Sequence, residues 1–138
     1  MVDGVVKDDF VIAGDPMALY DDDNIFAKIL RGEIPCTKCD EDDFTLSFHD
    51  IAPQAPVHVL VIPKGRYVDY ADFAANASAE EIVGFAAAIQ RVAEKTGISK
   101  TGYRIISNIG VDGHQEVPHL HMHVVGGAPT GPMLTKRS

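Results

Sequence analysis

The sequence predicts a single α+β domain in which an antiparallel sheet carries one long and one short helix. Segments of alternating or β-branched residues predict strands, and the run at 57–63 is the most strand-like of them. A long apolar stripe at helical spacing follows the capping-box pattern Ser78-x-x-Glu81. The link between the expected strands 44–49 and 57–63 is short, which favours antiparallel pairing. One face of the sheet is expected to carry the long helix.

The first elements follow from local signals. Asn24 is expected to cap a helix over about 25–31, and Gly32 is expected to end it. A short strand is expected at 36–40. The preceding residues, 1–22, lack sustained periodicity and are interpreted as a mobile N-terminal arm.

The second half of the chain is expected to open with a loop over 64–77 that contains a helical turn near 70–73. The long helix ends at Gly97, and a strand over 103–109 follows. A second strand covers 119–125. The core-facing stripe of the long helix is expected to be Ile82, Phe85, Ile89 and Val92, widened by Ala86 and Ala93.

The composition limits the class of protein. At 138 residues the chain suits one domain, expected at 23–127, with an irregular tail over 128–138. A net charge of −8 argues against a nucleic-acid scaffold but leaves free nucleotides as ligands. No apolar run reaches the length of a membrane span, and the N-terminus lacks a signal-peptide layout. We therefore expect no membrane partner and a cytoplasmic location.

Two cysteines, Cys36 and Cys39, form a Cys-x-x-Cys sequence. This spacing occurs in redox pairs and in half of a zinc site. A redox pair would stand at the start of a helix after a strand, whereas Pro35 precedes this one. Both cysteines are therefore interpreted as ordinary reduced residues.

Three of the six histidines alternate with apolar residues within 119–125. Because successive side chains on a strand point to opposite faces, His119, His121 and His123 are expected on one face. Leu120 and its alternate neighbours are expected to pack into the core. Clustered imidazoles are typical of a functional site rather than of a purely structural strand.

A neutral imidazole is a good nucleophile near pH 7, and attack on phosphorus gives a phosphohistidine that water can open. His121 is the candidate nucleophile, and His123 is placed to bind phosphoryl oxygens or to protonate the leaving group. His119 and His58 are expected to fix the tautomer and orientation of His121. The glycine-containing loop at 107–117 precedes the histidines directly and is a candidate phosphate cradle.

The run His119-Leu120-His121-Met122-His123-Val124-Val125 resembles the signature of the histidine triad (HIT) family of nucleotide hydrolases and transferases. The segment from Asn24 to Pro35 is similar to the family's opening segment. The segments from Phe48 to His58 and from Leu60 to Lys64 are similar to its central strand pair. The likeness covers roughly 24–127 and is greatest to the Hint (histidine triad nucleotide-binding) branch.

The resemblance implies a HIT-like fold and a homodimer whose sheet continues across the subunits. It implies that His121 is the nucleophile, supported by His123 and His58, and that Asp50 holds the ribose hydroxyls. The implied apolar base pocket consists of Ile25, Phe26, Ile34, Phe48 and Ile51. The implied phosphate-facing loop positions are Asn108, Gln115, Glu116 and Val117, with His114 as a further donor beside them.

The resemblance also implies an activity. Transferase relatives carry glutamine where this chain has His123, so hydrolysis is favoured. The Hint branch removes an amine from a nucleoside 5′-monophosphate, typically an AMP-like or GMP-like purine nucleotide, and its substrates include phosphoramidates and aminoacyl adenylates. No cofactor and no metal is expected. The branch that cleaves dinucleoside polyphosphates is less similar over 49–64.

Three departures from the family pattern bear on specificity. Glu116 stands where many members carry serine, and a carboxylate near phosphate is repulsive unless it is protonated or turned away. His114 stands where glycine is usual. The tail after Gly127 lacks the tryptophan-containing ending of well-known relatives, in which the tail reaches the partner's site.

Two other classes of function fit the same residues. His-x-His on a strand with a third histidine is a common metal-binding arrangement, which would be sensitive to chelators. A nucleotide-binding module that senses ligand without turnover would use the same side chains, and an intact His121 argues against it.

Overall fold

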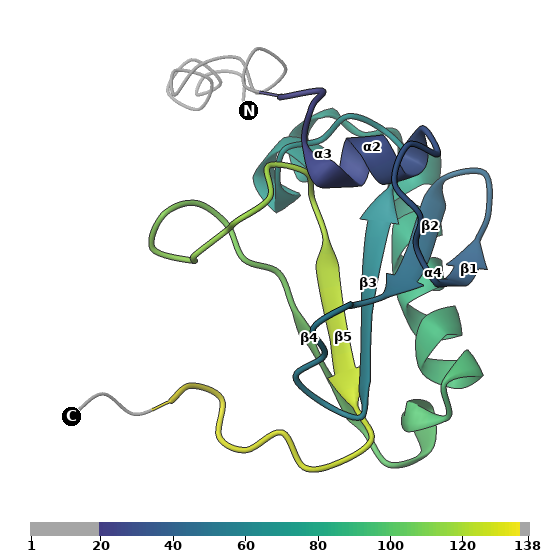
Figure 1. Cartoon of the computed structure of the whole chain (residues 1–138), viewed down its shortest axis with the longest axis vertical. Coiled ribbons are helices and arrows are strands. Elements are labelled where there is room, and N and C mark those ends of the chain that lie inside the picture. The colour runs from purple at the N-terminus through teal and green to yellow at the C-terminus, as the bar shows by residue number, and fades with distance from the viewer. Residues whose placement is uncertain (1–19, 136–138) are drawn as a thin grey trace.

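The computed structural model describes residues 20–135, which form a five-stranded antiparallel sheet with helices on both of its faces (Figure 1). The strand order is β1-β2-β3-β5-β4, so β1 and β4 are the edges. In chain order the elements are α2 (Ile25–Leu30), β1 (Lys38–Glu41), β2 (Thr45–His49), β3 (Val57–Pro63), α3 (Tyr70–Asn76), α4 (Ala79–Lys95), the 3-10 helix η2 (Ile98–Lys100), β4 (Tyr103–Ile106) and β5 (Met122–Gly126). The predicted α+β class is confirmed.

The long helix α4 covers one face of the sheet, behind the strands in Figure 1. Its capping box is present, because the Ser78 hydroxyl accepts from the Glu81 N–H and the Glu81 carboxylate accepts from the Ser78 N–H. The core on this face consists of Val59, Val61, Phe73, Phe85, Ala88, Ile89, Val92, Ala93, Ile98, Leu120 and Val124.

The predicted stripe of α4 needs two corrections. Ala88 is buried in place of Ala86, since position 88 lies only about 60° round the helix from Phe85 whereas position 86 lies about 100° away. Ile82, in the first turn, is exposed, so the buried stripe begins at Phe85.

The other face of the sheet carries α2. As predicted, the Asn24 side chain caps this helix by accepting from the Ala27 N–H at 2.9 Å. Gly32 lies just past the helix end with φ of +79°, a conformation that favours glycine. The apolar residues of this face form a second core cluster of Phe26, Leu46, Phe48, Leu60 and Ile62. The candidate site lies on the same face.

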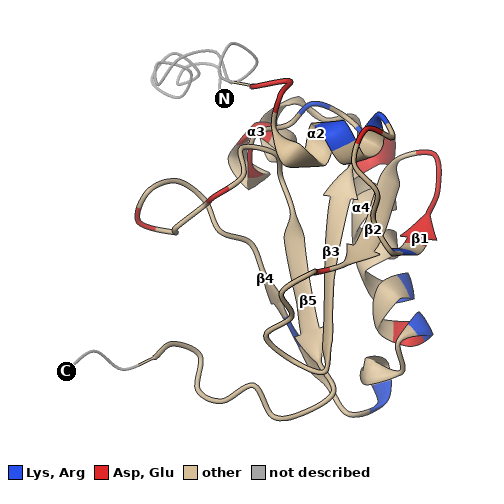
Figure 2. Cartoon of the chain, viewed as in Figure 1, with Lys and Arg blue, Asp and Glu red and all other residues tan. Residues whose placement is uncertain are grey.

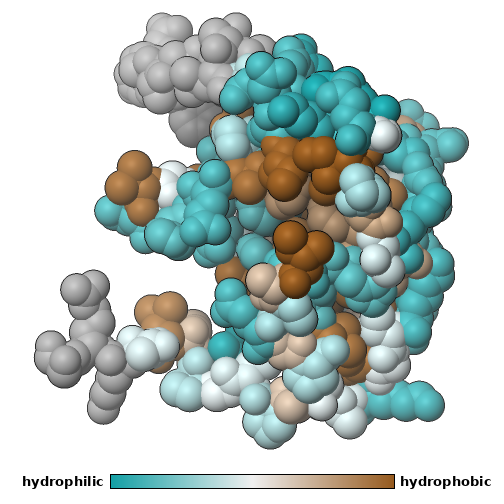
Figure 3. Space-filling model, viewed as in Figure 1, coloured by the Kyte–Doolittle hydropathy of each residue, from teal (hydrophilic) through white to brown (hydrophobic). Residues whose placement is uncertain are grey.

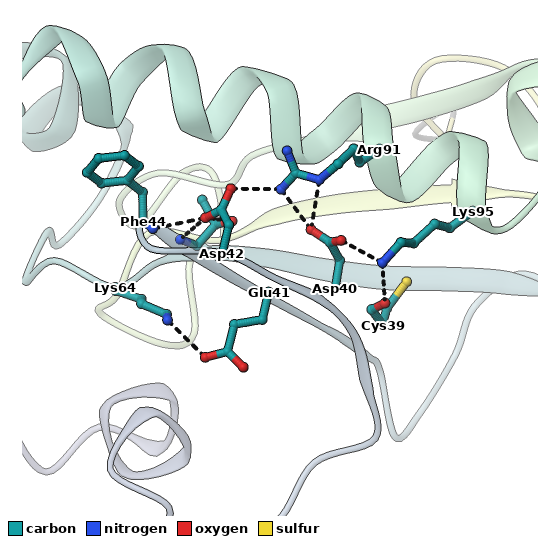
Figure 4. Close-up of polar contacts among 9 residues, drawn as sticks. Cys39, Asp40, Glu41, Asp42, Phe44, Lys64, Arg91 and Lys95 are labelled. Atoms are coloured by element: carbon teal, nitrogen blue, oxygen red, sulfur yellow. Dashed lines mark hydrogen bonds and ion pairs between the residues drawn. The ribbon is translucent and has the colours of Figure 1, made fainter.

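Ion pairs tie α4 to the β1–β2 hairpin (Figure 4). The Asp40 carboxylate is buried and accepts from Arg91 at 2.8 Å and from Lys95 at 2.7 Å. The same guanidinium reaches Asp42 at 2.8 Å. The Arg91 guanidinium, and after it the Lys95 ammonium, holds the pKa of Asp40 below its usual range despite burial. These ion pairs therefore have a structural role, which is to attach α4 to the hairpin.

Several predicted boundaries differ from the structure. The short strand expected at 36–40 spans Lys38–Glu41. The histidine strand begins at Met122 rather than at residue 119, because the Leu120 N–H donates to the Tyr67 carbonyl at 2.8 Å and not to a neighbouring strand. The strand expected over 103–109 ends at Ile106. The turn expected near 70–73 is a two-turn helix, α3, capped by the Asp69 carboxylate.

Most of the expected N-terminal arm, 1–22, lies outside the described residues. Its last part is described, and Tyr20 is buried there. The tail over 128–135 is irregular and exposed. Within 20–135, every helix is too short or too polar to cross a lipid bilayer.

Cys36 and Cys39 are both free and lie on different surfaces. Cys36 is exposed and lines a hollow together with Leu30 and Leu46, on the α2 side. Cys39 packs against the core beneath α4. Burial raises the pKa of both thiols, so neither is an activated nucleophile.

Candidate functional site

Four histidines meet on the α2 face of the sheet. His58 lies on β3 and His123 on β5, two residues apart in the register and so on the same face, since Leu60 pairs with His123 and His58 pairs with Val125. The ring of His123 lies 5.2 Å from that of His58 and 5.1 Å from that of His121, between centroids. The rings of His58, His121 and His123 therefore lie together, although β5 begins only at residue 122.

The His121 imidazole is held in one tautomer by the main chain. Its Nδ1 lies 2.7 Å from the carbonyl oxygen of His119, and a carbonyl only accepts, so Nδ1 carries the proton. In the neutral ring Nε2 then keeps a free lone pair. Burial, with the residue 7% exposed, lowers the pKa of His121, which keeps the ring neutral at pH 7. Phe26 packs edge-on to it at 4.9 Å between ring centroids.

His119 contributes its carbonyl to His121 and turns its own ring elsewhere. The ring is 0% exposed, and its Nε2 lies 2.9 Å from the Pro63 carbonyl. Burial lowers the pKa of His119 to about 4, so the ring is neutral and donates from Nε2 to Pro63. Nδ1 is then an acceptor, and the Tyr20 hydroxyl donates to it at 2.6 Å.

His58 and His123 form a second chain of fixed tautomers. The Gln54 N–H donates to Nδ1 of His58 at 3.0 Å, so His58 carries its proton on Nε2. That N–H donates to Nδ1 of His123 at 2.9 Å, which leaves the proton of neutral His123 on its Nε2. Burial, then the neighbouring His121 and His58, lower the pKa of His123 to about 4. His58 was expected to orient His121, but its ring is hydrogen-bonded to His123 instead.

Asp50 stands beside this chain. Its Oδ1 accepts from the Ala52 N–H at 2.8 Å, and its Oδ2 lies 3.4 Å from Nε2 of His58. The side chain is 20% exposed, so Oδ2 is within reach of a ligand hydroxyl.

Asp50, His58 and His123 bring three donor atoms within 4.8 Å of one another, a distance compatible with one metal ion. The hydrogen bonds disfavour this use. A ligating histidine donates its other ring N–H to an acceptor, whereas Nδ1 of His58 faces the N–H donor of Gln54. His58 is therefore arranged as a link in a hydrogen-bonded chain rather than as a metal ligand.

The residues expected to form a base pocket divide into two groups. Phe26 and Phe48 are buried in the core and stack edge-to-face at 5.6 Å between ring centroids. Ile25 and Ile51 are 43% and 96% exposed, and Ile34 is half-buried. Apolar surface lies below α2 on the viewed face (Figure 3). The exposed isoleucines are thus free to contact a ligand, while the phenylalanines shape the wall behind them.

Asn108 follows β4 and lines a cleft of about 380 Å³ together with His58, His123 and Arg104. Lys and Arg are lacking along β3 and β5, while charged residues gather on β1, α2 and α4 (Figure 2). The cation of this cleft, Arg104, donates to the carbonyls of Gly131 and Pro132. Beside His123 itself, an anion would meet neutral N–H donors.

The loop over 110–117 is stabilised by hydrogen bonds and contacts of its own side chains. The Gln115 amide donates to the carbonyls of Val68 and Val117, at 2.8 and 2.9 Å, so this side chain is used within the protein. Val117 packs against the α2-side core. His114 has φ of +60°, which is unusual for a residue with a side chain, and its Nε2 lies 3.1 Å from the Glu116 carboxylate. Both of these side chains are exposed.

The partners that fix the tautomers were missed by the sequence interpretation. Pro63 and Gln54 act through main-chain groups, which leave no signal in residue type. Tyr20 stands alone ahead of an acidic run, without a periodic pattern to mark it as buried.

Comparison with known proteins agrees with the geometry. Residues 31–130 match the HIT domain family model. A purine nucleoside phosphoramidase of Escherichia coli strain K12 is 42% identical over 117 residues, covering 84% of this chain and 97% of that protein. An uncharacterised HIT-like protein of Azospirillum brasilense is 58% identical over 117 residues, covering 85% and 96%.

Solved structures show the same fold. A HIT family hydrolase from Clostridium thermocellum superposes with a TM-score of 0.76 at 39% identity, covering 83% of this chain and 99% of that one. The predicted resemblance to the histidine triad family is confirmed, and this chain belongs to the HIT family.

Proposed function

We propose that this protein is a purine nucleoside phosphoramidase, which hydrolyses nucleoside 5′-monophosphate amidates or aminoacyl adenylates through a nucleotidyl-His121 intermediate. The relative from E. coli named above supports the activity class. The observation that carries the proposal is the bond from Nδ1 of His121 to the His119 carbonyl, because it leaves the Nε2 lone pair of a neutral ring free to attack.

In the first step Nε2 of His121 attacks phosphorus and the bond from phosphorus to the leaving nitrogen breaks. The amine departs with one proton taken from solvent. In the second step water attacks phosphorus, the bond to His121 breaks, and the water returns one proton to solvent. With an amidate the products are the amine and the nucleoside monophosphate. With an aminoacyl adenylate the bond that breaks in the first step joins phosphorus to the acyl oxygen, and the amino acid leaves as its carboxylate without taking a proton. His121 regains its starting state in both cases.

In this scheme the groups around His121 stabilise negative charge on the phosphoryl oxygens rather than transferring protons. His123 in its Nε2–H tautomer donates to a phosphoryl oxygen, and Asn108 supplies a second neutral donor from the same cleft. Asp50 holds the ribose hydroxyls. The base lies on Ile25 and Ile51, with Phe26 behind them.

We also propose a homodimer in which β4 of one subunit pairs with β4 of the next. In the described chain β4 is an edge strand, and Ile105 on it is exposed. Light scattering of the wild type and of Ile105→Lys tests this, with a dimer expected for the first and a monomer for the second.

The test of the function is release of amine from adenosine 5′-phosphoramidate, with and without a strong chelator. Turnover that survives the chelator is expected, and His121→Ala should abolish it while AMP still binds. His49→Ala is the matched control, since His49 is exposed on β2 and takes no part in the site. Full activity in His121→Ala would refute the assignment of the nucleophile.

Two other results point to the alternatives. Turnover that stops with chelator and returns with zinc would identify a metal site. Tight AMP binding with no turnover by the wild type would identify a nucleotide-binding module.

A further inference from the structure

Tyr20 reaches the histidine cluster from the far end of the chain. Its hydroxyl lies 2.6 Å from Nδ1 of His119, a residue 99 positions later. The tyrosine is 9% exposed, and its ring meets that of His119 edge-on at 5.6 Å between centroids. A buried hydroxyl within hydrogen-bond distance of a buried ring nitrogen is a specific contact rather than incidental packing.

The direction of this hydrogen bond is fixed. Nε2 of His119 donates to the Pro63 carbonyl, so Nδ1 of the neutral ring can only accept, and the Tyr20 hydroxyl is the donor. The His119 ring is thereby held at both nitrogens. Removal of either partner would leave a polar atom of a fully buried ring without a hydrogen bond.

Tyr20 is itself held in place ahead of α2. The Arg66 guanidinium carbon lies 5.0 Å from the centroid of the Tyr20 ring, as in a cation–π contact. Arg66 also forms two hydrogen bonds of 2.9 Å to the Asp22 carboxylate. These contacts restrict the ring that delivers the hydroxyl to His119.

We propose that Tyr20 is a positioning residue for the nucleophile. It holds the His119 ring, and through it the His119 carbonyl that accepts from Nδ1 of His121 at 2.7 Å. A shift of this carbonyl would release the tautomer that leaves Nε2 of His121 free for attack. This role rests on the proposed phosphoramidase activity and adds a residue to it.

The test compares Tyr20→Phe with Tyr67→Phe in the full chain. The two substitutions remove the same atom, but the Tyr67 hydroxyl bonds to the Glu81 carboxylate at 2.8 Å, on the α4 side of the sheet. With adenosine 5′-phosphoramidate we expect Tyr20→Phe to lower kcat about five- to twentyfold with KM unchanged. Tyr67→Phe should leave both constants within about twofold of the wild type.

A second variant distinguishes the effect of losing the Tyr20 hydroxyl from the effect of loosening the Tyr20 ring. Arg66→Gln keeps the hydroxyl but removes the cation above the ring, so a smaller loss of kcat is expected. Equal losses in Tyr20→Phe and Tyr67→Phe, or a rise in KM alone, would overturn the positioning role.

The ¹⁵N shifts of the imidazole nitrogens provide a readout that does not need turnover. In the wild type His121 should be protonated at Nδ1, and Tyr20→Phe should show a mixture of tautomers. An unchanged His121 tautomer in Tyr20→Phe would overturn the proposal. If the wild type lacks turnover but Tyr20→Phe still changes the His121 tautomer, the proposed activity is refuted while the positioning role of Tyr20 stands.

Discussion

At the scale of single residues, the main chain determines the protonation pattern of His58. Gln54 donates to it through its N–H, so the Gln54 side chain is dispensable while the N–H is not. Proline has no N–H. We expect Gln54→Pro to lower kcat about tenfold, as His58 and His123 lose their defined tautomers, and Gln54→Ala to stay within about twofold of the wild type. Steady-state kinetics with a phosphoramidate measures both, and equal losses would exclude the role of the N–H.

Asp50 gives a second prediction at this scale. Its Oδ2 is open to a ligand, and removal of a carboxylate that accepts from two hydroxyls costs about 1.5–3 kcal/mol. Asp50→Ala should therefore weaken AMP binding about tenfold or more in calorimetry. A 2′,3′-dideoxy analogue should bind the variant and the wild type alike. Equal losses for the two ligands would remove the ribose role from Asp50.

The residue types in the site were predictable, but their partners were not. Three alternating histidines and His58 are visible in the sequence because imidazoles carry the chemistry. The groups that fix their tautomers are the N–H of Gln54 and the carbonyls of Pro63 and His119. Every residue type offers such carbonyls, so only the three-dimensional structure identifies which ones are used.

At the scale of elements, helix and strand signals worked best where local and tertiary preferences agree. The strand Val57–Pro63 was predicted with its observed bounds, and the Asn24 and Ser78 caps were predicted at their observed positions. The start of the histidine strand was wrong because the Leu120 N–H bonds to Tyr67, a contact between distant segments. Alternation alone cannot reveal where a ladder of hydrogen bonds begins.

The attachment of α4 to β1 gives a prediction at the scale of elements. Arg91→Met leaves the buried Asp40 carboxylate with Lys95 alone, and the loss should lower the free energy of unfolding by about 1–2 kcal/mol. Because Arg91 is partly exposed, added salt should reduce the difference from the wild type. Urea unfolding at low and high salt measures this. Lys38→Met, which removes an exposed pair with Glu41, is the control and should leave the free energy of unfolding close to that of the wild type.

At the scale of the whole molecule, the buried histidines make stability depend on pH. The pKa of His119 and of His123 is lowered from 6.5 to about 4 in the folded chain. Between these pH values the unfolded chain binds more protons than the folded chain. The free energy of unfolding is therefore highest above pH 6.5 and decreases as the pH falls towards 4. Each such histidine contributes a slope of at most about 1.4 kcal/mol per pH unit.

Urea unfolding between pH 4.5 and 7 tests this dependence. The wild type should lose stability as the solution is acidified, and His123→Asn should show a shallower slope. His49→Asn, at an exposed position, should follow the wild type. A wild-type curve that is flat over this range would contradict the burial of neutral histidines.

The use of main-chain groups to orient the imidazoles has a consequence for how this protein can evolve. Position 54 accepts any residue with an N–H, and position 63 supplies its carbonyl whatever its side chain. Neutral drift at these positions can proceed without changing the protonation pattern of the site. A search for conserved side chains would therefore pass over two of the groups that prepare the nucleophile and its neighbours.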